Sequence, residues 1–354
     1  MGHAQIQNGT PFLVEPLHLL DERARPVLTL VVKGTFLIGA DGRCTRAEEQ
    51  VPVNVAGEPW GEDLEVSSYR YEPEVAFTKL ATDVVVNGHA WAPKAGTTEL
   101  SVGLRVGALQ KQAMAVGDRV WFKSMGQISA SKPRPFEKLP LRWERAFGGW
   151  DRSNPDPARH ACEARNPVGV GLRPSKAFEE GLRLPNIEEL EKPLRKFGEV
   201  VAPAGFGFVS PHWQPRAALA GTYDERWQKE RAPLLPKNFD RAHLNAAAPG
   251  LTARGYLRGD EAVVTVGMSP QGTLRFSLPG VPPPWLRVTM TRGREQVLPT
   301  NLDTIILEPD ERRVLLLWRA CLALTTGPHD VKALEISNEQ PRPRPVVPDE
   351  DLSS

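Results

Sequence analysis

The sequence predicts a mainly β protein, with antiparallel sheets of sandwich or barrel type at both ends and a loop-rich middle containing short helices. Strand-sized apolar runs, such as 27–32 and 314–318, lie towards both ends of the chain. The 34 prolines and 30 glycines exceed the average share of about 12%, and both residues interrupt regular elements. We therefore expect β regions over 1–128 and 249–335, a middle over 129–248 and a Pro-rich, disordered tail over 336–354, or one compact domain holding them all.

The N-terminal region predicts strands that are joined by short turns. A β-branched run over 27–38 ends at Asp41-Gly42, and the buried strand 83–86 runs into Asn87-Gly88, both of which are strong turn signals. Apolar residues then alternate over 102–106, the pattern of a half-solvated strand. Further strands are expected over 109–116 and 120–122. The connections are too short for parallel crossovers, which predicts an antiparallel meander.

The middle region has few periodic runs and carries proline every few residues. One short helix is expected over 187–192, stopped by Pro193. A second is expected to start at Thr222, with Glu225 completing a capping box and Pro233 ending the helix. A loop-rich stretch of this length inside a compact protein is typical of a functional segment or of an ordered layer over a sheet.

The C-terminal region again predicts strands, over 262–266, 273–278 and 286–291. The runs 305–307 and 314–318 are separated by a polar turn over 308–311 and predict a hairpin. From Gln340 onward the repeated Pro-Arg pattern favours polyproline II and a solvated tail.

Composition excludes several functional classes. A formal net charge of +1 gives no broad field for nucleic acid or anionic lipid. No stretch approaches the ~18 apolar residues needed to span a bilayer, and the first eight residues lack the features of a secretory signal. Three scattered cysteines do not make a disulfide framework. We expect a cytoplasmic protein that neither inserts into membranes nor binds nucleic acid.

No motif predicts a cofactor, a metal site or a catalytic nucleophile. The stretch 166–171 lacks the glycine and lysine pattern of a phosphate loop, and His160 and Cys162 have no second pair at metal-ligand spacing. One alternative remains, a carbohydrate-active protein that is either a glycoside hydrolase or a glycan-binding module. It rests on carboxylates close to tryptophans, in Trp143-Glu144, in Trp150-Asp151 and in Asp224 and Glu225 near Trp227. The competing interpretation is that these acids cap helices or pair with the neighbouring Arg142, Arg145, Arg152 and Arg226.

The densest aromatic and polar cluster spans 139–151. Trp and Arg are enriched at protein–protein hot spots, since they bury a large area with defined geometry. Core packing explains the same residues equally well, with Trp143 and Phe147 inside and Arg145 paired with an internal carboxylate. The sequence leaves both interpretations open.

This cluster and several other motifs resemble a bacterial family catalogued as domain of unknown function 2169, which occurs in type VI secretion gene clusters. The motifs follow one another in the stretches 8–12, 32–36, 82–90, 117–121, 135–151, 166–169, 184–186, 203–207, 221–227, 257–259 and 302–304. Two departures are the less acidic 237–240 and the tail after Ile336.

The resemblance implies a non-enzymatic cytoplasmic adaptor or chaperone, which stabilises a type VI effector or a PAAR-type tip protein and helps to load it onto the VgrG spike. A structural role in the secretion baseplate is a further possibility. No catalytic residues carry over. We expect the partner either to add a strand to an exposed sheet edge or, as we favour, to place a helix or tail in a groove of the middle region. The partner-binding candidates are Trp143, Glu144, Arg145, Phe147, Trp150, Asp151, Asn166, Tyr223, Asp224, Arg226 and Trp227, and an internal salt-bridge network is the competing role for the polar ones.

Overall fold

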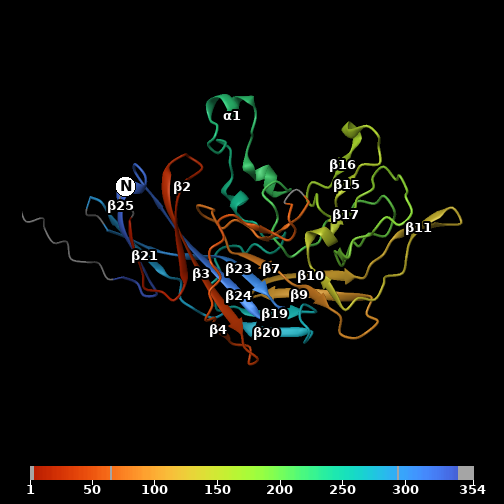
Figure 1. Cartoon of the computed structure of the whole chain (residues 1–354), viewed down its shortest axis with the longest axis horizontal. Coiled ribbons are helices and arrows are strands. Elements are labelled where there is room, and N and C mark those ends of the chain that lie inside the picture. The colour runs from red at the N-terminus through yellow and green to blue at the C-terminus, as the bar shows by residue number, and fades with distance from the viewer. Residues whose placement is uncertain (1–3, 64–65, 293–294, 342–354) are drawn as a thin grey trace, which may run out of the picture.

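The structure is a computed structural model, which describes residues 4–63, 66–292 and 295–341. Strands dominate the chain and most pair antiparallel, so the mainly β prediction is confirmed. The sheet that contains β21 and β25 lies at one end of the long axis, and the hairpin that begins with β11 lies at the other (Figure 1). Within the described part of the chain, no helix is both long and apolar enough to cross a membrane.

The largest sheet has six strands and joins the two ends of the chain. Its order is β2 (Leu13–Leu20), β3 (Pro26–Ile38), β24 (Arg313–Ala323), β23 (Asn301–Glu308) and β7 (Asp83–Val86), with β4 (Cys44–Arg46) also pairing with β3. Neighbours are antiparallel except β7 and β23, which run parallel. The predicted hairpin of β23 and β24 is confirmed.

Two further sheets extend this arrangement. The five-stranded sheet has the order β18 (Ile187–Glu188), β10 (Leu109–Val116), β9 (Glu99–Val106), β19 (Ala262–Val266) and β20 (Thr273–Ser277). The four-stranded sheet has the order β1 (Gln5–Asn8), β25 (Val331–Ser337), β21 (Trp285–Met290) and β22 (Glu295–Pro299). Strands from both predicted terminal regions therefore share sheets.

The remaining elements are short and lie mostly in the middle region. The strand pairs are β5 (Glu58–Pro59) with β6 (Tyr69–Tyr71), β8 (His89–Trp91) with β13 (Lys138–Pro140), β11 (Trp121–Ser124) with β12 (Gln127–Ala130), β14 (Phe147–Gly148) with β17 (Val170–Gly171), and β15 (Trp150–Asp151) with β16 (Ala161–Cys162). The helices are α1 (Glu225–Glu230) and the 3-10 turns η1 (Trp143–Arg145), η2 (Pro157–Arg159), η3 (Arg216–Ala220), η4 (Arg241–Leu244) and η5 (Pro328–Asp330).

The predicted meander is correct only for β9 and β10, which form an antiparallel hairpin. The strand at 120–122 does not continue it, because β11 pairs with β12 and the free edge of β10 is taken by β18. The strand at 83–86 is also outside it. Asn87-Gly88 makes no hairpin between β7 and β8, since β7 pairs with β23 and β8 with β13.

Both predicted helices need correction. The helix at 187–192 is wrong, because Ile187 is fully buried and pairs with Ala115 as part of β18. The second helix exists but begins at Glu225. Its cap is Asp224 rather than Thr222, and the Asp224 carboxylate accepts a hydrogen bond from the backbone N–H of Trp227.

The tail was predicted to start at residue 336, but β25 continues to Ser337. Residues 342–354, which hold most of the Pro-rich segment, lie outside the described residues.

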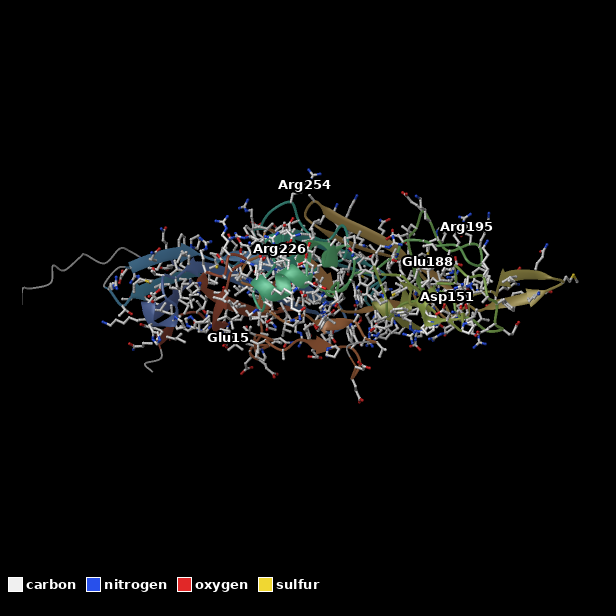
Figure 2. The ribbon with its side chains drawn as sticks, turned by 90° about the horizontal axis from the view of Figure 1, so that it is seen from above. Glu15, Asp151, Glu188, Arg195, Arg226 and Arg254 are labelled. Atoms are coloured by element: carbon white, nitrogen blue, oxygen red, sulfur yellow. The ribbon has the colours of Figure 1, made fainter. Side chains whose placement is uncertain are left out.

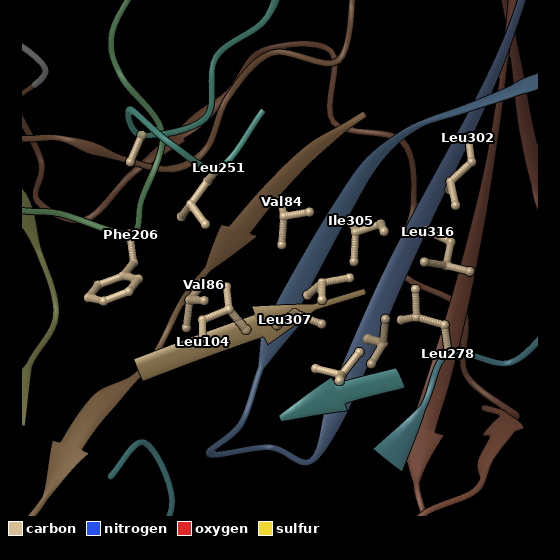
Figure 3. Close-up of a cluster of buried hydrophobic side chains, with 14 of the residues drawn as sticks. Val84, Val86, Leu104, Phe206, Leu251, Leu278, Leu302, Ile305, Leu307 and Leu316 are labelled. Atoms are coloured by element: carbon tan, nitrogen blue, oxygen red, sulfur yellow. The ribbon is translucent and has the colours of Figure 1, made fainter. Parts of the chain in front are cut away.

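The main core joins the six-stranded and five-stranded sheets (Figure 3). Val84, Ile305 and Leu316 supply one side of it and Leu104 the other. Alternate residues of β3, β23 and β24 point to the opposite face of the large sheet. That face holds a smaller apolar cluster together with buried ion pairs, namely Lys33–Glu74, Lys79–Asp83 and Arg319–Asp303.

Candidate functional site

Two loops of the middle region interlock through a buried asparagine. Asn166 is inaccessible to solvent, and its side-chain amide donates to the carbonyls of Trp143 at 2.8 Å and Phe147 at 3.0 Å. Its own backbone carbonyl accepts from the N–H of Gly149 at 2.9 Å. The parallel pair β14–β17 and the antiparallel pair β15–β16 complete the unit. We call residues 146–151 and 166–171 the interlocked loops.

Glycine is required where these loops touch. Gly149 has φ +87°, and a Cβ placed on it would lie 2.3 Å from the carbonyl oxygen of Gly169. Gly148 has φ +154°, and its Cβ would lie 2.1 Å from the carbonyl oxygen of Asn166. Only a residue without a side chain fits both the conformation and the close approach. The Gly-Gly pair of the motif is thus explained by packing.

Trp143 and Phe147, two of the predicted partner-binding residues, lie in the core. The Trp143 ring is buried, its Nε1 donates to the carbonyl of Phe208 at 2.8 Å, and it meets Trp213 edge to face. Phe147 is buried in a separate cluster with Trp121. Neither side chain lies on the outer surface of the molecule.

The polar neighbours of these rings, Glu144 and Arg145, form hydrogen bonds within the chain. The Glu144 carboxylate accepts hydrogen bonds from the N–H of Ser68 at 2.6 Å and from the hydroxyls of Ser67 and Ser68. Arg145 donates to the Asp118 carboxylate at 3.3 Å and to the side-chain carbonyl of Asn186 at 3.2 Å. Arg145 is therefore paired with a carboxylate, but the Asp118 side chain is 63% exposed, so the partner is not an internal one. Among the described residues, Glu144 forms no ion pair with a neighbouring arginine and is held by Ser67 and Ser68 instead.

The buried Asp151 carboxylate is held by hydrogen bonds from partly exposed neighbours. Its carboxylate accepts from the hydroxyl of Ser153 at 2.7 Å, from the N–H of Ser175 at 3.1 Å and from Arg173 at 3.2 Å, so its arginine partner is Arg173 and not Arg152. Burial alone would raise the pKa of this carboxyl, but the hydrogen bonds from Ser153 and Ser175 outweigh burial and lower it overall. Asp151 thus stays charged and fixes the loop that follows β15.

Trp150 points outward from the same strand. Successive residues of a strand face opposite sides, so burial of Asp151 places the Trp150 ring at the surface, where 46% of the residue is exposed. The guanidinium of Arg152 lies over the ring, 5.0 Å from its centroid. The interlocked loops therefore present an aromatic ring and a cation side by side.

These two side chains line an open cleft of about 960 Å³. The segment 66–69 contributes Val66, which is 66% exposed, and Tyr69, while the segment 210–213 contributes His212 and Trp213. A second depression of about 420 Å³ shares Trp150 and Arg173 with the cleft and extends it towards β11. We call the two together the Trp150 groove.

The other predicted site residues lie on a separate arm around α1 (Figure 1). Tyr223 is 53% exposed and meets Trp227 edge to face, with the ring centroids 4.6 Å apart. Arg226 pairs with Glu230 along the helix rather than with its neighbours Asp224 and Glu225. Arg226 and Asp151 lie in different parts of the molecule (Figure 2), so the eleven candidates form two groups that the fold keeps apart.

Sequence reasoning missed most of the groove lining. Val66 and Tyr69 stand far before Trp150 in the sequence and His212 far after it, and no periodic pattern marks any of the three. Arg152 was expected to pair with a carboxylate but lies on the Trp150 ring instead. Over the described residues, no three His, Cys, Asp or Glu side chains gather as a metal site.

Comparison with known proteins gives one match. No curated protein and no solved structure matches the chain. A family model matches residues 23–319, well over half of the chain, and its span includes the interlocked loops, the groove lining and the α1 arm. The chain therefore belongs to the bacterial family described as "Uncharacterized protein conserved in bacteria (DUF2169)".

Proposed function

We propose that this protein is a non-enzymatic cytoplasmic adaptor, which binds a type VI secretion effector or a PAAR-type tip protein in the Trp150 groove and assists its loading onto the VgrG spike. The class of partner comes from the resemblance of the motifs to a family found in type VI secretion gene clusters. The role of adaptor rests on the character of the groove.

The observation that carries the proposal is the exposed Trp150 on a rigid support. The interlocked loops use Asn166, two glycines and Asp151 to hold β15 in place, and the residue they present is an aromatic ring stacked by Arg152. Trp and Arg in an open, preformed groove are the residue types that dominate binding energy at protein interfaces. Exposed Val66 on the facing segment adds apolar area for a partner.

Asp151 and Glu144, the carboxylates that adjoin tryptophans in the 139–151 cluster, are poorly suited to glycosidic cleavage. A general acid for that reaction needs a raised pKa, whereas the pKa of Asp151 is lowered and its carboxylate is enclosed by hydrogen-bond donors. Glu144 is likewise occupied by Ser67 and Ser68. Glycan binding without cleavage remains the second candidate, because Trp150 and Tyr69 could stack on sugar rings.

The test is co-purification of the tagged chain with the effector or PAAR-type protein encoded beside it. We expect a complex with the unaltered chain and a loss of affinity of roughly 30-fold in Trp150→Ala, because truncating a hot-spot residue costs about 2 kcal/mol or more. Leu37→Ala is the matched control, since Leu37 has the same 46% exposure but lies on β3, away from the groove.

Failure of both neighbouring proteins to co-purify would contradict the proposal, as would a complex that Trp150→Ala leaves intact. Binding of peptidoglycan or oligosaccharide fragments that depends on Trp150 would favour the glycan-binding candidate instead. Turnover of such fragments would exclude a purely binding role.

A further inference from the structure

A second cavity, separate from the Trp150 groove, lies between β10 and the segments 202–215 and 249. It has a volume of about 400 Å³, within the range of pockets that hold small ligands. Its walls are mainly apolar and come from Trp143, Val209, Pro203, Pro215 and Pro249. It shares no lining residue with the groove, although Trp143 on its wall contacts Trp213 in the groove edge to face.

Four polar side chains also line this proline-walled pocket. Arg165 is already engaged, because it forms a two-pronged ion pair with Glu163 at 2.7 Å and donates to the carbonyl of Val201. The other three are Lys111, Glu189 and Gln214.

Lys111 is a half-buried cation whose observed partner is neutral. Its ammonium donates to the carbonyl of Pro249 at 2.7 Å, and no carboxylate of the described residues lies within ion-pair distance of it. Burial lowers the pKa of Lys111, and the charge of Glu189 only partly offsets this. A carboxylate brought into the pocket would supply the missing counter-ion.

Gln214 and Glu189 extend this polar side. No hydrogen bond from the Gln214 side chain to another described residue is present, so its amide is free to donate. The Glu189 carboxylate, on the same wall, can accept an N–H. The pocket thus offers two donors for a carboxylate, an acceptor for a neighbouring N–H and apolar walls for a side chain. The C-terminal residue of a polypeptide and a free amino acid both carry this combination of groups.

We propose that the proline-walled pocket binds an apolar amino-acid residue through its free α-carboxylate, with Lys111 and Gln214 holding the carboxylate, Glu189 accepting the α-nitrogen proton, and Trp143 packing against the side chain. The residue is either the C-terminal residue of a polypeptide or a free amino acid, because both carry the same group. The site does not depend on the adaptor function or on the Trp150 groove.

The experiment measures the affinity of the full chain for labelled hexapeptides that end in Phe or Leu, by fluorescence anisotropy. We expect the free acids to bind and the matching C-terminal amides to bind at least tenfold more weakly, because a hydrogen bond to a charged group is lost. Competition with L-phenylalanine separates the two sources. If L-phenylalanine displaces the labelled peptide as effectively as the unlabelled peptide does at the same concentration, the ligand is a free amino acid. If L-phenylalanine does not displace the peptide, the ligand is a polypeptide C-terminus.

Two variants and one control locate the site. Lys111→Met keeps most of the length of the unbranched side chain but removes its charge. It should weaken binding of the free-acid peptides at least tenfold while leaving binding of the amides unchanged. Ala202→Phe, on the exposed lip of the pocket, should block both. Lys123→Met on β11 is the matched control and should change nothing. Equal binding of acid and amide, absence of binding by both acids, or full affinity in Lys111→Met would overturn the proposal.

Discussion

Asn166→Ala tests whether the interlocked loops depend on one buried amide. The substitution removes two hydrogen bonds, at 2.8 and 3.0 Å, and leaves the carbonyls of Trp143 and Phe147 without that donor. A buried acceptor that loses its partner costs about 1–3 kcal/mol. The Trp143 carbonyl still accepts a hydrogen bond from the N–H of Ala146 at 3.0 Å, so the cost of its lost bond is at the low end of this range. The substitution also removes the buried side-chain oxygen of Asn166, which has no hydrogen-bond partner among the described residues and so offsets part of this cost. We therefore expect a net loss of about 1–3 kcal/mol in the free energy of unfolding.

Chemical denaturation followed by tryptophan fluorescence measures this loss. Asn301→Ala is the matched control, because Asn301 is exposed and its side chain has no hydrogen bond to the described residues. It should change the stability by less than about 0.5 kcal/mol. If Asn166→Ala costs no more than this control, the amide does not hold the loops together and the support assigned to Trp150 is wrong.

Three further predictions concern stability. Lys33→Met should cost about 3–5 kcal/mol because it leaves the buried Glu74 carboxylate unpaired, and adding Glu74→Leu should recover much of the loss in thermal melts. Because the pKa of Asp151 is lowered in the folded state, the stabilisation from its carboxylate is complete above the ordinary carboxyl pKa and is lost as the pH falls towards the folded-state value. The difference in the free energy of unfolding between the unaltered chain and Asp151→Asn should therefore narrow from pH 5 towards about pH 2. Gly149→Ala should prevent folding in expression trials, whereas Gly96→Ala, with a similar φ but open space around it, should cost only about 1 kcal/mol.

Periodicity predicted the strands that have one polar and one buried face, or a long apolar run. The element over 262–266 matches β19, and 27–38 differs from β3 by one residue. Periodicity did not predict the strand at Ile187-Glu188, where two residues form a strand only because β10 offers a free edge. Parallel pairing of β7 with β23 joins segments from the N-terminal and C-terminal regions, and nothing local in either strand specifies it.

The candidate site was predictable as a cluster but not as a surface. Trp143, Phe147 and Trp150 are equally apolar in sequence, yet the first two are buried and the third is exposed. Their different fates depend on the turn imposed by Gly148-Gly149 and on the partner loop at Asn166, which comes later in the chain. Residue type alone therefore identifies hot-spot candidates, while backbone conformation decides which of them a partner can reach.

If the proposed function is correct, this arrangement separates stability from binding within one motif. The Asn166 amide nitrogen and the Asp151 carboxylate form hydrogen bonds inside the fold, and Gly149 fits where no side chain could, so changes at these three residues should act on the free energy of unfolding first. Trp150 and Arg152 contact each other at the surface and contribute little that the fold needs, so changes there should act on partner affinity alone. Trp143 lines the proline-walled pocket and contacts Trp213 in the groove, and Gln214 of the pocket directly follows Trp213, so the two cavities could influence each other through these residues. The test measures the affinity of the Trp150 groove for its partner with and without a peptide in the pocket, in the unaltered chain and in Ala202→Phe, whose pocket is blocked. A change in affinity that occurs only in the unaltered chain would show that the two cavities are coupled.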